Sequence, residues 1–153
     1  MKRTGVVLIL LFAFCGLVDS AYIALHEMSG TPLICDINHL SGCNTVVASP
    51  YSYLFGIPLA EYGILFYCIV LVLAALELVV FDQLLRRALQ GISLVGVIAS
   101  LYFTLMQVFV IKAFCVYCLG SAFIAVLILI LSTFIEPIDR RVWQKSPAPP
   151  LAG

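Results

Sequence analysis

The sequence predicts an all-α integral membrane protein, a bundle of four transmembrane helices with one long loop outside the membrane. Three observations lead to this: 63% of the 153 residues are hydrophobic, only 10% are charged, and the mean hydropathy is +1.16. Soluble domains have about 45–50% apolar and about 25% charged residues. The composition therefore excludes an ordinary soluble domain, and the formal net charge of zero excludes a basic nucleic-acid-binding surface.

Four apolar stretches are each long enough to cross about 30 Å of hydrocarbon as a helix. They cover about residues 5–25, 59–81, 88–111 and 115–135. Each must be helical, because lipid offers no hydrogen-bond partner to the backbone. The first stretch also suits a signal peptide, but it is long and no small-residue cleavage site follows, so we favour an uncleaved helix.

These helices define one membrane domain, residues 1–137, followed by a proline-rich tail, residues 138–153, that we expect to be disordered and cytoplasmic. The long loop covers about residues 26–57. Within it, Ser41 is expected to cap a short interfacial helix that runs to about Ser49. Residues 46–48 are expected on the membrane surface, with the aromatic residues that follow them at the headgroup boundary.

The basic residues predict the orientation of the bundle. Of the eight Lys and Arg residues, only Lys112 lies in the turn between the third and fourth helices, on the side of the long loop. The others lie before the first helix, between the second and third helices, or after the fourth: Lys2, Arg3, Arg86, Arg87, Arg140, Arg141 and Lys145. Because positive charge marks the cytoplasmic side, both termini are expected there and the long loop outside.

A C-x-x-C motif, Cys115-Val116-Tyr117-Cys118, opens the fourth helix at its outer mouth. Residues three apart share a helical face, so these two sulfurs can meet. The helix N-terminus and the nearby Lys112 favour a thiolate there. Two alternative explanations of the motif are half of a zinc site and a pair of cysteines that only pack in the core. Zinc would need a second closely spaced pair of ligands, so we favour redox chemistry and expect no metal.

Cys35 and Cys43 form a second pair in the outer loop, on the side of a membrane where disulfides persist. Thiolate attack can move a disulfide from one pair to the other, so two pairs on one face make a relay. A simple staple of the loop is the alternative for Cys35 and Cys43. Cys15 and Cys68 lie inside the first two helices and are interpreted as small apolar packing residues.

Several of these residues together resemble the vitamin K epoxide reductase family, in particular its bacterial and archaeal homologues. The matching features are Cys35 and Cys43 in the first outer loop and Ser49 six residues further on. The stretch GILFY at residues 63–67 and the stretch FCVYC at residues 114–118 match as well. The resemblance extends from about residue 19 to residue 135.

The resemblance implies roles for each of these residues. Cys115 and Cys118 would be the pair beside a quinone (ubiquinone or menaquinone), with Cys118 facing it and Cys115 exchanging with Cys43. Cys35 and Cys43 would be the shuttle that meets a thioredoxin-fold partner, Cys35 being attacked first. Ser49 would support the quinone site. Many bacterial members carry a fused thioredoxin-like domain, whereas this chain stops soon after the fourth helix, so we expect a separate periplasmic or extracellular oxidase as partner.

Aromatic residues near Cys118 are the candidates for a quinone pocket. Tyr62 and Phe66 share one face of the second helix, and Phe114 adjoins the C-x-x-C motif. Small polar residues that help to hold the quinone in the animal enzymes are not evident, because Leu59 and Ala122 occupy the corresponding places.

The resulting hypothesis is a membrane thiol–disulfide oxidoreductase of a bacterial or archaeal inner membrane. It would pass electrons from the partner through the two cysteine pairs to a quinone and so support disulfide formation. Glu61 and Asp36 are candidate proton relays. Quinone-epoxide reduction by the same cysteines and a non-enzymatic subunit with two structural disulfides remain alternatives. The other bacterial four-helix disulfide oxidase is disfavoured, because its C-x-x-C lies in the first outer loop.

Overall fold

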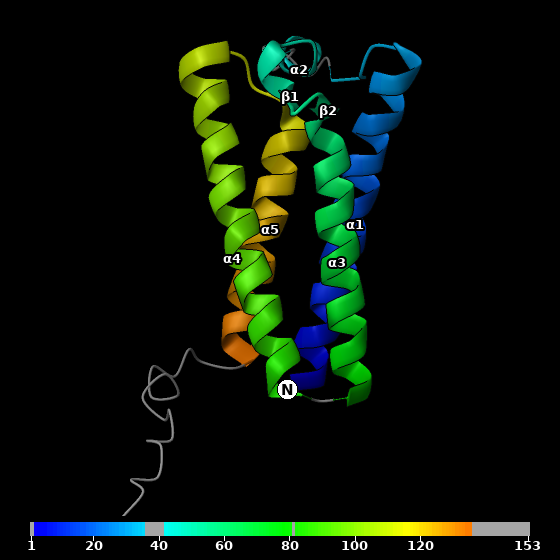
Figure 1. Ribbon diagram of the computed structural model, residues 1–153, viewed down its shortest axis with the longest axis vertical. Helices are drawn as coiled ribbons and strands as arrows, with labels where there is room; N and C mark the ends of the chain where they lie inside the picture. Colours follow the sequence, from blue (N-terminus) through cyan, green and yellow to red (C-terminus); the bar gives the residue numbers. More distant parts are fainter. Residues whose placement is uncertain (1, 36–41, 81, 136–153) are drawn as a thin grey trace, which may run out of the picture.

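The computed structural model describes residues 2–35, 42–80 and 82–135. Four long helices lie side by side in it: α1 (Lys2–Ser29), α3 (Leu59–Val80), α4 (Gln83–Met106) and α5 (Val116–Ile135) (Figure 1). All four are long and apolar enough to cross a membrane. The predicted four-helix membrane bundle is therefore confirmed, and the protein is a multi-pass membrane protein. The tail at 138–153 and Asp36 lie outside the described residues.

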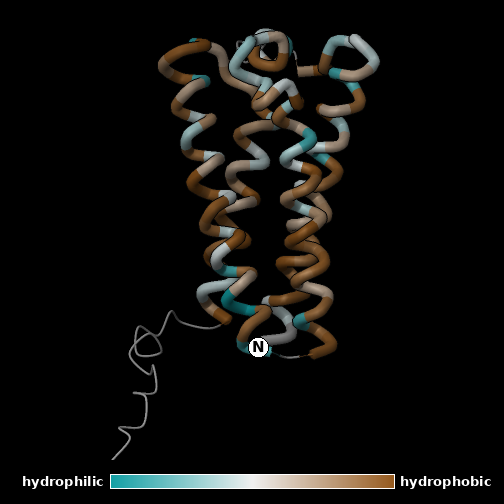
Figure 2. The backbone as a smooth tube through the Cα atoms, in the orientation of Figure 1, coloured by the Kyte–Doolittle hydropathy of each residue, from teal (hydrophilic) through white to brown (hydrophobic). Residues whose placement is uncertain are grey.

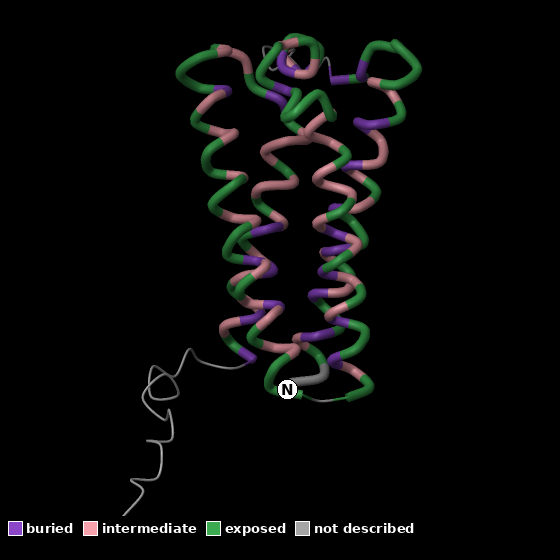
Figure 3. Tube along the Cα trace, viewed as in Figure 1, coloured by how far each residue is buried: buried purple, intermediate pink, exposed green. Residues whose placement is uncertain are grey.

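Apolar side chains cover the outside of the bundle as well as its inside. The hydrophobic colour in Figure 2 runs along all four helices, and Figure 3 shows that much of this surface is exposed. Such a surface suits lipid, which solvates apolar side chains. Inside, α1 contacts α3 and α5, and α4 contacts both of these helices too. Gly16 receives the ring of Tyr67 and Gly96 the ring of Phe66, because small residues let membrane helices approach closely.

The first helix is longer than predicted at both ends. It runs from Lys2 to Ser29 instead of about 5–25. Apolar composition marks only the lipid-embedded part of such a helix, and polar residues at the interface continue it. Gly30, which has a φ of 65°, follows its last residue, in the left-handed conformation that commonly ends a helix.

The third membrane helix begins at Gln83 and not near residue 88, as its apolar stretch had predicted. Asp82 is the reason, since its Oδ1 accepts a hydrogen bond from the backbone N–H of Leu84 and caps the helix. Arg86 and Arg87 therefore lie in α4 and not in a loop. Arg86 forms an ion pair with Glu77 of α3.

The segment between α4 and α5 is short. A π-helical turn, η2 (Gln107–Ile111), continues α4. Lys112 then takes the left-handed conformation with a φ of 55°, which reverses the chain toward α5.

The long loop folds into a small cap over one end of the bundle. It contains helix α2 (Cys43–Val47), a 3₁₀ turn η1 (Pro50–Ser52) and an antiparallel hairpin of β1 (Tyr53–Leu54) and β2 (Ile57–Pro58). The hairpin turn is Phe55-Gly56, and both residues have positive φ. Phe55 is 92% exposed at its tip, as an anchor at the headgroup boundary would be.

The short helix of the loop is present but differs from its prediction. It ends at Val47 and not near Ser49, and its N-cap is Gly42 and not Ser41, without a side-chain cap. Val46 is buried and Val47 half-buried, so the apolar face of α2 does not lie on the membrane surface. It faces inward because it packs onto the cysteines beneath it.

Figure 1 shows the cap and the α4–α5 turn at one end of the bundle, and the N-terminus and the α3–α4 turn at the other. The loop cysteines and the C-x-x-C motif therefore lie at the same end.

Candidate active site

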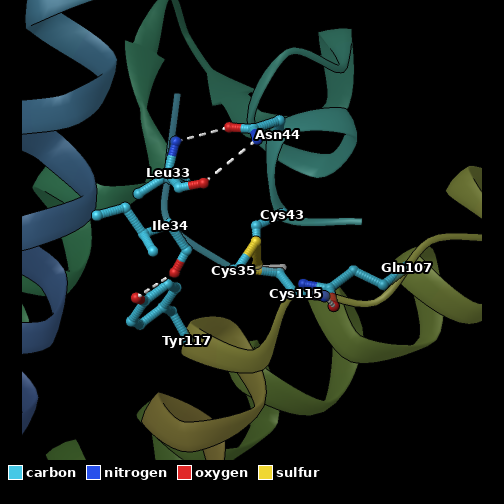
Figure 4. Close-up of a disulfide and its surroundings, with 8 residues drawn as sticks. All are labelled: Leu33, Ile34, Cys35, Cys43, Asn44, Gln107, Cys115 and Tyr117. Carbon is cyan, nitrogen blue, oxygen red and sulfur yellow. Dashed lines mark hydrogen bonds between the residues drawn. A yellow bond between two sulfur atoms is a disulfide. The ribbon is translucent and has the colours of Figure 1, made fainter. Parts of the chain in front are cut away.

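Four cysteines gather where the cap meets the start of α5. Cys35 and Cys43 form a disulfide, whereas Cys115 and Cys118 are free thiols. Cys35, Cys43 and Cys115 belong to one buried cluster, and Cys118 packs against it. Cys43 and Cys115 are 0% exposed. Figure 4 shows the disulfide next to Cys115, so the structure brings the two pairs together as a relay requires.

Hydrogen bonds of the two residues that precede Cys35 hold this segment in place (Figure 4). The backbone N–H of Leu33 donates to Asn44 Oδ1 at 2.8 Å, and the Asn44 amide donates back to the Leu33 carbonyl at 3.4 Å. The Tyr117 hydroxyl donates to the carbonyl of Ile34 at 3.0 Å. The segment that carries Cys35 is thus tied both to α2 and to α5.

Cys115 immediately precedes α5, and its carbonyl accepts the first helical hydrogen bond, from Leu119 N–H at 3.0 Å. The pKa of its thiol is lowered to about 7, mainly because the Cys118 thiol hydrogen-bonds to it. The backbone N–H groups of Cys118 and Tyr117 at the helix N-terminus add to this effect, while burial opposes it. Cys115 is therefore the sulfur of the pair that forms a thiolate near neutral pH.

Gln107 is a site residue that the sequence analysis missed. It is buried at the start of the π-helical turn. Its Oε1 accepts a hydrogen bond from the backbone N–H of Cys115 at 3.4 Å, and its side chain also reaches the Cys118 thiol. The available signal was one uncharged polar residue in an apolar span, eight residues before the C-x-x-C motif.

A cavity of about 320 Å³ lies beside Cys118, lined by all four long helices and by the cap. Ser49, Tyr62 and Phe66 line it, as their predicted role requires. Phe114 does not line it, since its side chain is substantially exposed and its backbone packs against Gly42. The cavity is mostly apolar and could hold a flat, apolar ring system.

Polar groups line the cavity at a few places. The hydroxyl of Ser49 donates to the Val46 carbonyl at 2.7 Å, so only its lone pairs remain to meet a ligand. The Tyr67 hydroxyl meets both the carbonyl and the hydroxyl of Ser121, at 2.9 and 2.8 Å. Asp19 and Glu27 of α1 are the acidic lining residues.

Of the two candidate proton relays of the sequence analysis, only Glu61 lies within the described structure, and it does not reach this cavity. Glu61 is exposed and does not line it, and Asp36 lies outside the described residues. Of the two apolar residues at places that are polar in the animal enzymes, Leu59 lines the cavity and Ala122 does not.

The family model that matches this sequence is described as the vitamin K epoxide reductase family, and it covers residues 7–133. This chain belongs to that family. The match spans most of the first and last helices, the two between them and both cysteine pairs, so the predicted family is confirmed.

A similar protein is the thiol-disulfide oxidoreductase LTO1 of Arabidopsis thaliana. It is 32% identical over 123 residues, which cover 76% of this chain and 32% of that protein. This member of the vitamin K epoxide reductase family thus spans about a third of the length of the curated relative that it matches.

The two remaining cysteines of this family member lie away from the site. Cys15 is an exposed residue of α1, so it faces the lipid. The prediction that it is a packing residue is wrong. Cys68 of α3 is half-buried. Neither belongs to the cluster around the disulfide.

Proposed function

We propose that this protein is a membrane thiol–disulfide oxidoreductase that moves electrons from a reduced thioredoxin-fold partner to a membrane quinone and so supports disulfide formation. The electrons would pass through Cys35 and Cys43 and then through Cys115 and Cys118. One observation carries the proposal: the loop disulfide is buried against Cys115, while Cys118 lines a cavity. Membership in the vitamin K epoxide reductase family supports it.

In the first step, a thiolate of the partner attacks Cys35, the Cys35–Cys43 bond breaks, and Cys43 leaves as a thiolate. The second thiol of the partner then releases the partner as a disulfide, which leaves two electrons on Cys35 and Cys43. Attack at Cys35 is favoured because Cys35, although buried at 5% exposure, adjoins Ile34, which is 79% exposed, whereas Cys43 is 0% exposed. The partner would dock over this edge of the cap.

In the second step, the Cys43 thiolate attacks Cys115 of a Cys115–Cys118 disulfide, and Cys118 leaves as a thiolate. Cys35 then attacks Cys43, which re-forms the loop disulfide and frees Cys115. The lowered pKa of Cys115 makes it a good leaving group in this exchange. The product has a loop disulfide and two free thiols at the helix, the same combination that the structure contains.

A quinone suits the cavity beside Cys118. Ligand pockets measure about 300–1,000 Å³, and this one, of about 320 Å³, is apolar enough for a quinone ring. Ser49, Tyr62 and Phe66 would contact the ring. Ubiquinone and menaquinone are both candidates, and either would supply a two-electron acceptor. The protein would supply the position of the ring and the thiolates that reduce it.

The basic residues support an orientation with the cysteines outside the cytoplasm. Arg86 and Arg87 lie at the end of the bundle opposite the cap. With the positive end inside, the cap faces the periplasm or the cell exterior. The partner would therefore be a periplasmic or extracellular oxidase, and the membrane a bacterial or archaeal inner membrane.

The test reconstitutes the purified protein in lipid with ubiquinone or menaquinone and a reduced thioredoxin-fold oxidase. Quinone reduction and partner oxidation are followed together. We expect Cys118→Ala to abolish quinone reduction and Cys15→Ala, at an exposed position of α1, to retain it. Quinone reduction that continues unchanged in Cys118→Ala would contradict the proposal.

Reduction of a quinone epoxide by the same cysteines is a second candidate, favoured by the family to which the chain belongs. Thiols of the partner would again supply the electrons, and the epoxide would accept them. The same reconstituted protein, given a quinone epoxide in place of the quinone, separates the two activities.

A further inference from the structure

Reduction of a quinone needs protons as well as electrons. When Cys115 and Cys118 form their disulfide, two electrons leave the sulfurs and two protons must reach the two carbonyl oxygens of the quinone. The Cys118 thiol, which hydrogen-bonds to Cys115, carries one of these protons. Cys115 cannot supply one from its thiolate form, which its lowered pKa favours near neutral pH. The proposed function, on which this inference rests, therefore requires a proton donor in the cavity.

Asp19 is placed to be this donor. It lines the same cavity as Cys118, from the opposing helix α1. Its Oδ2 is buried and has no hydrogen-bond partner among the described residues. Among the described residues, the cavity lining contains no Lys, Arg or His that could hold the carboxylate as an ion pair. An ionisable residue inside a membrane span without such a partner is a functional candidate.

Both reacting cysteines are among the groups on which the charge of Asp19 acts. Its negative charge acts on Tyr67 of α3, on Cys118 and Tyr117 of α5, and on Cys115. It raises the pKa of Cys115 and so opposes the thiolate. A protonated Asp19 removes this opposition, and its proton is then available when the electrons leave the sulfurs.

Glu27 connects this position to the surface of the cap. It lies eight residues, or about 12 Å, further along α1 and lines the same cavity. Its Oε1 is also buried and lacks a hydrogen-bond partner within the described part of the chain. The Tyr53 hydroxyl donates a hydrogen bond to Glu27, which raises the pKa of Tyr53, and Tyr53 is exposed on the hairpin. The two acids thus line one route from the aqueous face to Cys118.

We propose that Asp19 is the proton donor for quinone reduction and that Glu27 reloads it from the side of the cap. The carboxylic acid of Asp19 gives its proton to a carbonyl oxygen as the Cys115–Cys118 bond forms. The resulting carboxylate is then reprotonated from Glu27 through water that enters the cavity. The second proton comes from the Cys118 thiol. In total, one thiol, one thiolate, one quinone and one proton give one disulfide and one quinol.

The test uses the full chain in lipid, with Cys115 and Cys118 reduced beforehand and one turnover followed after quinone is added. General acid catalysis is worth about 10²–10⁴-fold, so we expect Asp19→Asn to slow this step by at least about 100-fold. Asp19→Glu should restore much of the rate, and Glu27→Gln should slow it less than Asp19→Asn. The matched control is Glu61→Gln, an exposed acid of α3 outside the cavity, which should not slow it.

Two further measurements separate a proton donor from a structural residue. The wild-type rate should fall on the alkaline side as the donor loses its proton, and Asp19→Asn should lack this fall. An infrared difference spectrum of the dithiol-to-disulfide conversion should contain a carboxylic acid band that Asp19→Asn loses and Glu61→Gln keeps. Exchange between the partner and the loop disulfide should keep its wild-type rate in Asp19→Asn, which also checks the fold.

The outcomes separate this inference from the proposed function. If Cys118→Ala abolishes quinone reduction but Asp19→Asn matches Glu61→Gln in rate and in its infrared band, Asp19 is not the donor and the electron route stands. If quinone reduction survives in Cys118→Ala, the proposed function itself is wrong.

Discussion

Gly42 packs directly on the backbone of Phe114. A Cβ atom at Gly42 would lie 2.8 Å from both the nitrogen and the carbonyl oxygen of Phe114 and 2.9 Å from the Cβ of Ala113. These distances are too short for any side chain, so only glycine permits this approach. Because Gly42 precedes Cys43 and Phe114 precedes Cys115, the contact sets how closely the two cysteine pairs meet.

Gly42→Ala should therefore separate the pairs. The added methyl group must push α2 away from a backbone that cannot yield, and overpacking of this kind costs about 1–3 kcal/mol. We expect exchange between Cys43 and Cys115 to slow by at least about tenfold, measured by acid quenching and thiol trapping. Attack of the partner on Cys35 should be unaffected. Gly120→Ala is the control, since nothing lies within 4 Å of a Cβ there, and an equal loss in both variants would contradict the explanation.

The Cys115 thiol should titrate near pH 7. In a variant without Cys15 and Cys68, ultraviolet thiolate absorbance should rise with a midpoint of about 7, because the hydrogen bond from Cys118 stabilises the thiolate. Exchange that uses this thiolate should slow as the pH falls through that midpoint. Cys118→Ala should move the midpoint toward 9, the ordinary value, and Cys118→Ser, which retains a donor, should move it less. An unchanged midpoint in Cys118→Ala would show that the helix N-terminus acts alone.

Gln107→Leu should change both stability and thiol chemistry. The substitution removes the acceptor of the Cys115 N–H. This N–H group is then buried without a hydrogen-bond partner, which lowers the free energy of unfolding by about 1–3 kcal/mol. We expect a lower thermal midpoint and an altered reduction potential of the Cys115–Cys118 pair. Gln90→Leu is the comparison, because its amide donates to the Ser132 carbonyl, far from the cysteines. It should lower stability without changing the potential, and a shifted potential there would contradict a local role for Gln107.

A partner with a single cysteine should be captured at Cys35. In Cys115→Ala, the electrons on Cys43 have no onward path, so the mixed disulfide should accumulate. Peptide mass spectrometry should then find the partner on Cys35, which lies next to the exposed Ile34, and not on Cys43. A purely structural disulfide would capture no partner, and a crosslink at Cys43 would reverse the proposed order. Cys68→Ala should behave as the wild type does.

Much of this architecture could be predicted from composition and spacing. Four apolar stretches of about 20 residues can only be four spans, and their alternating direction places the loop cysteines and the C-x-x-C motif at one end. The four-residue spacing of Tyr62 and Phe66 placed both on one face, and both line the cavity. The length of an apolar stretch and the period of the α-helix suffice for such conclusions. These conclusions concern one helix at a time and do not depend on how the helices pack together.

The tertiary structure decided which side chains point into the site and which point away from it. Asp19 and Gln107 enter the site, Phe114 stays outside the cavity, and Val46 turns inward onto the cysteines. No pattern in the sequence distinguishes these cases. In a membrane helix the side chains that face lipid are as apolar as those that face the core, so periodicity does not reveal which face packs. Sequence alone thus determined the spans, their order and the end that carries the sulfurs. Only the packing of α1, α4, α5 and the cap decided which polar groups surround those sulfurs.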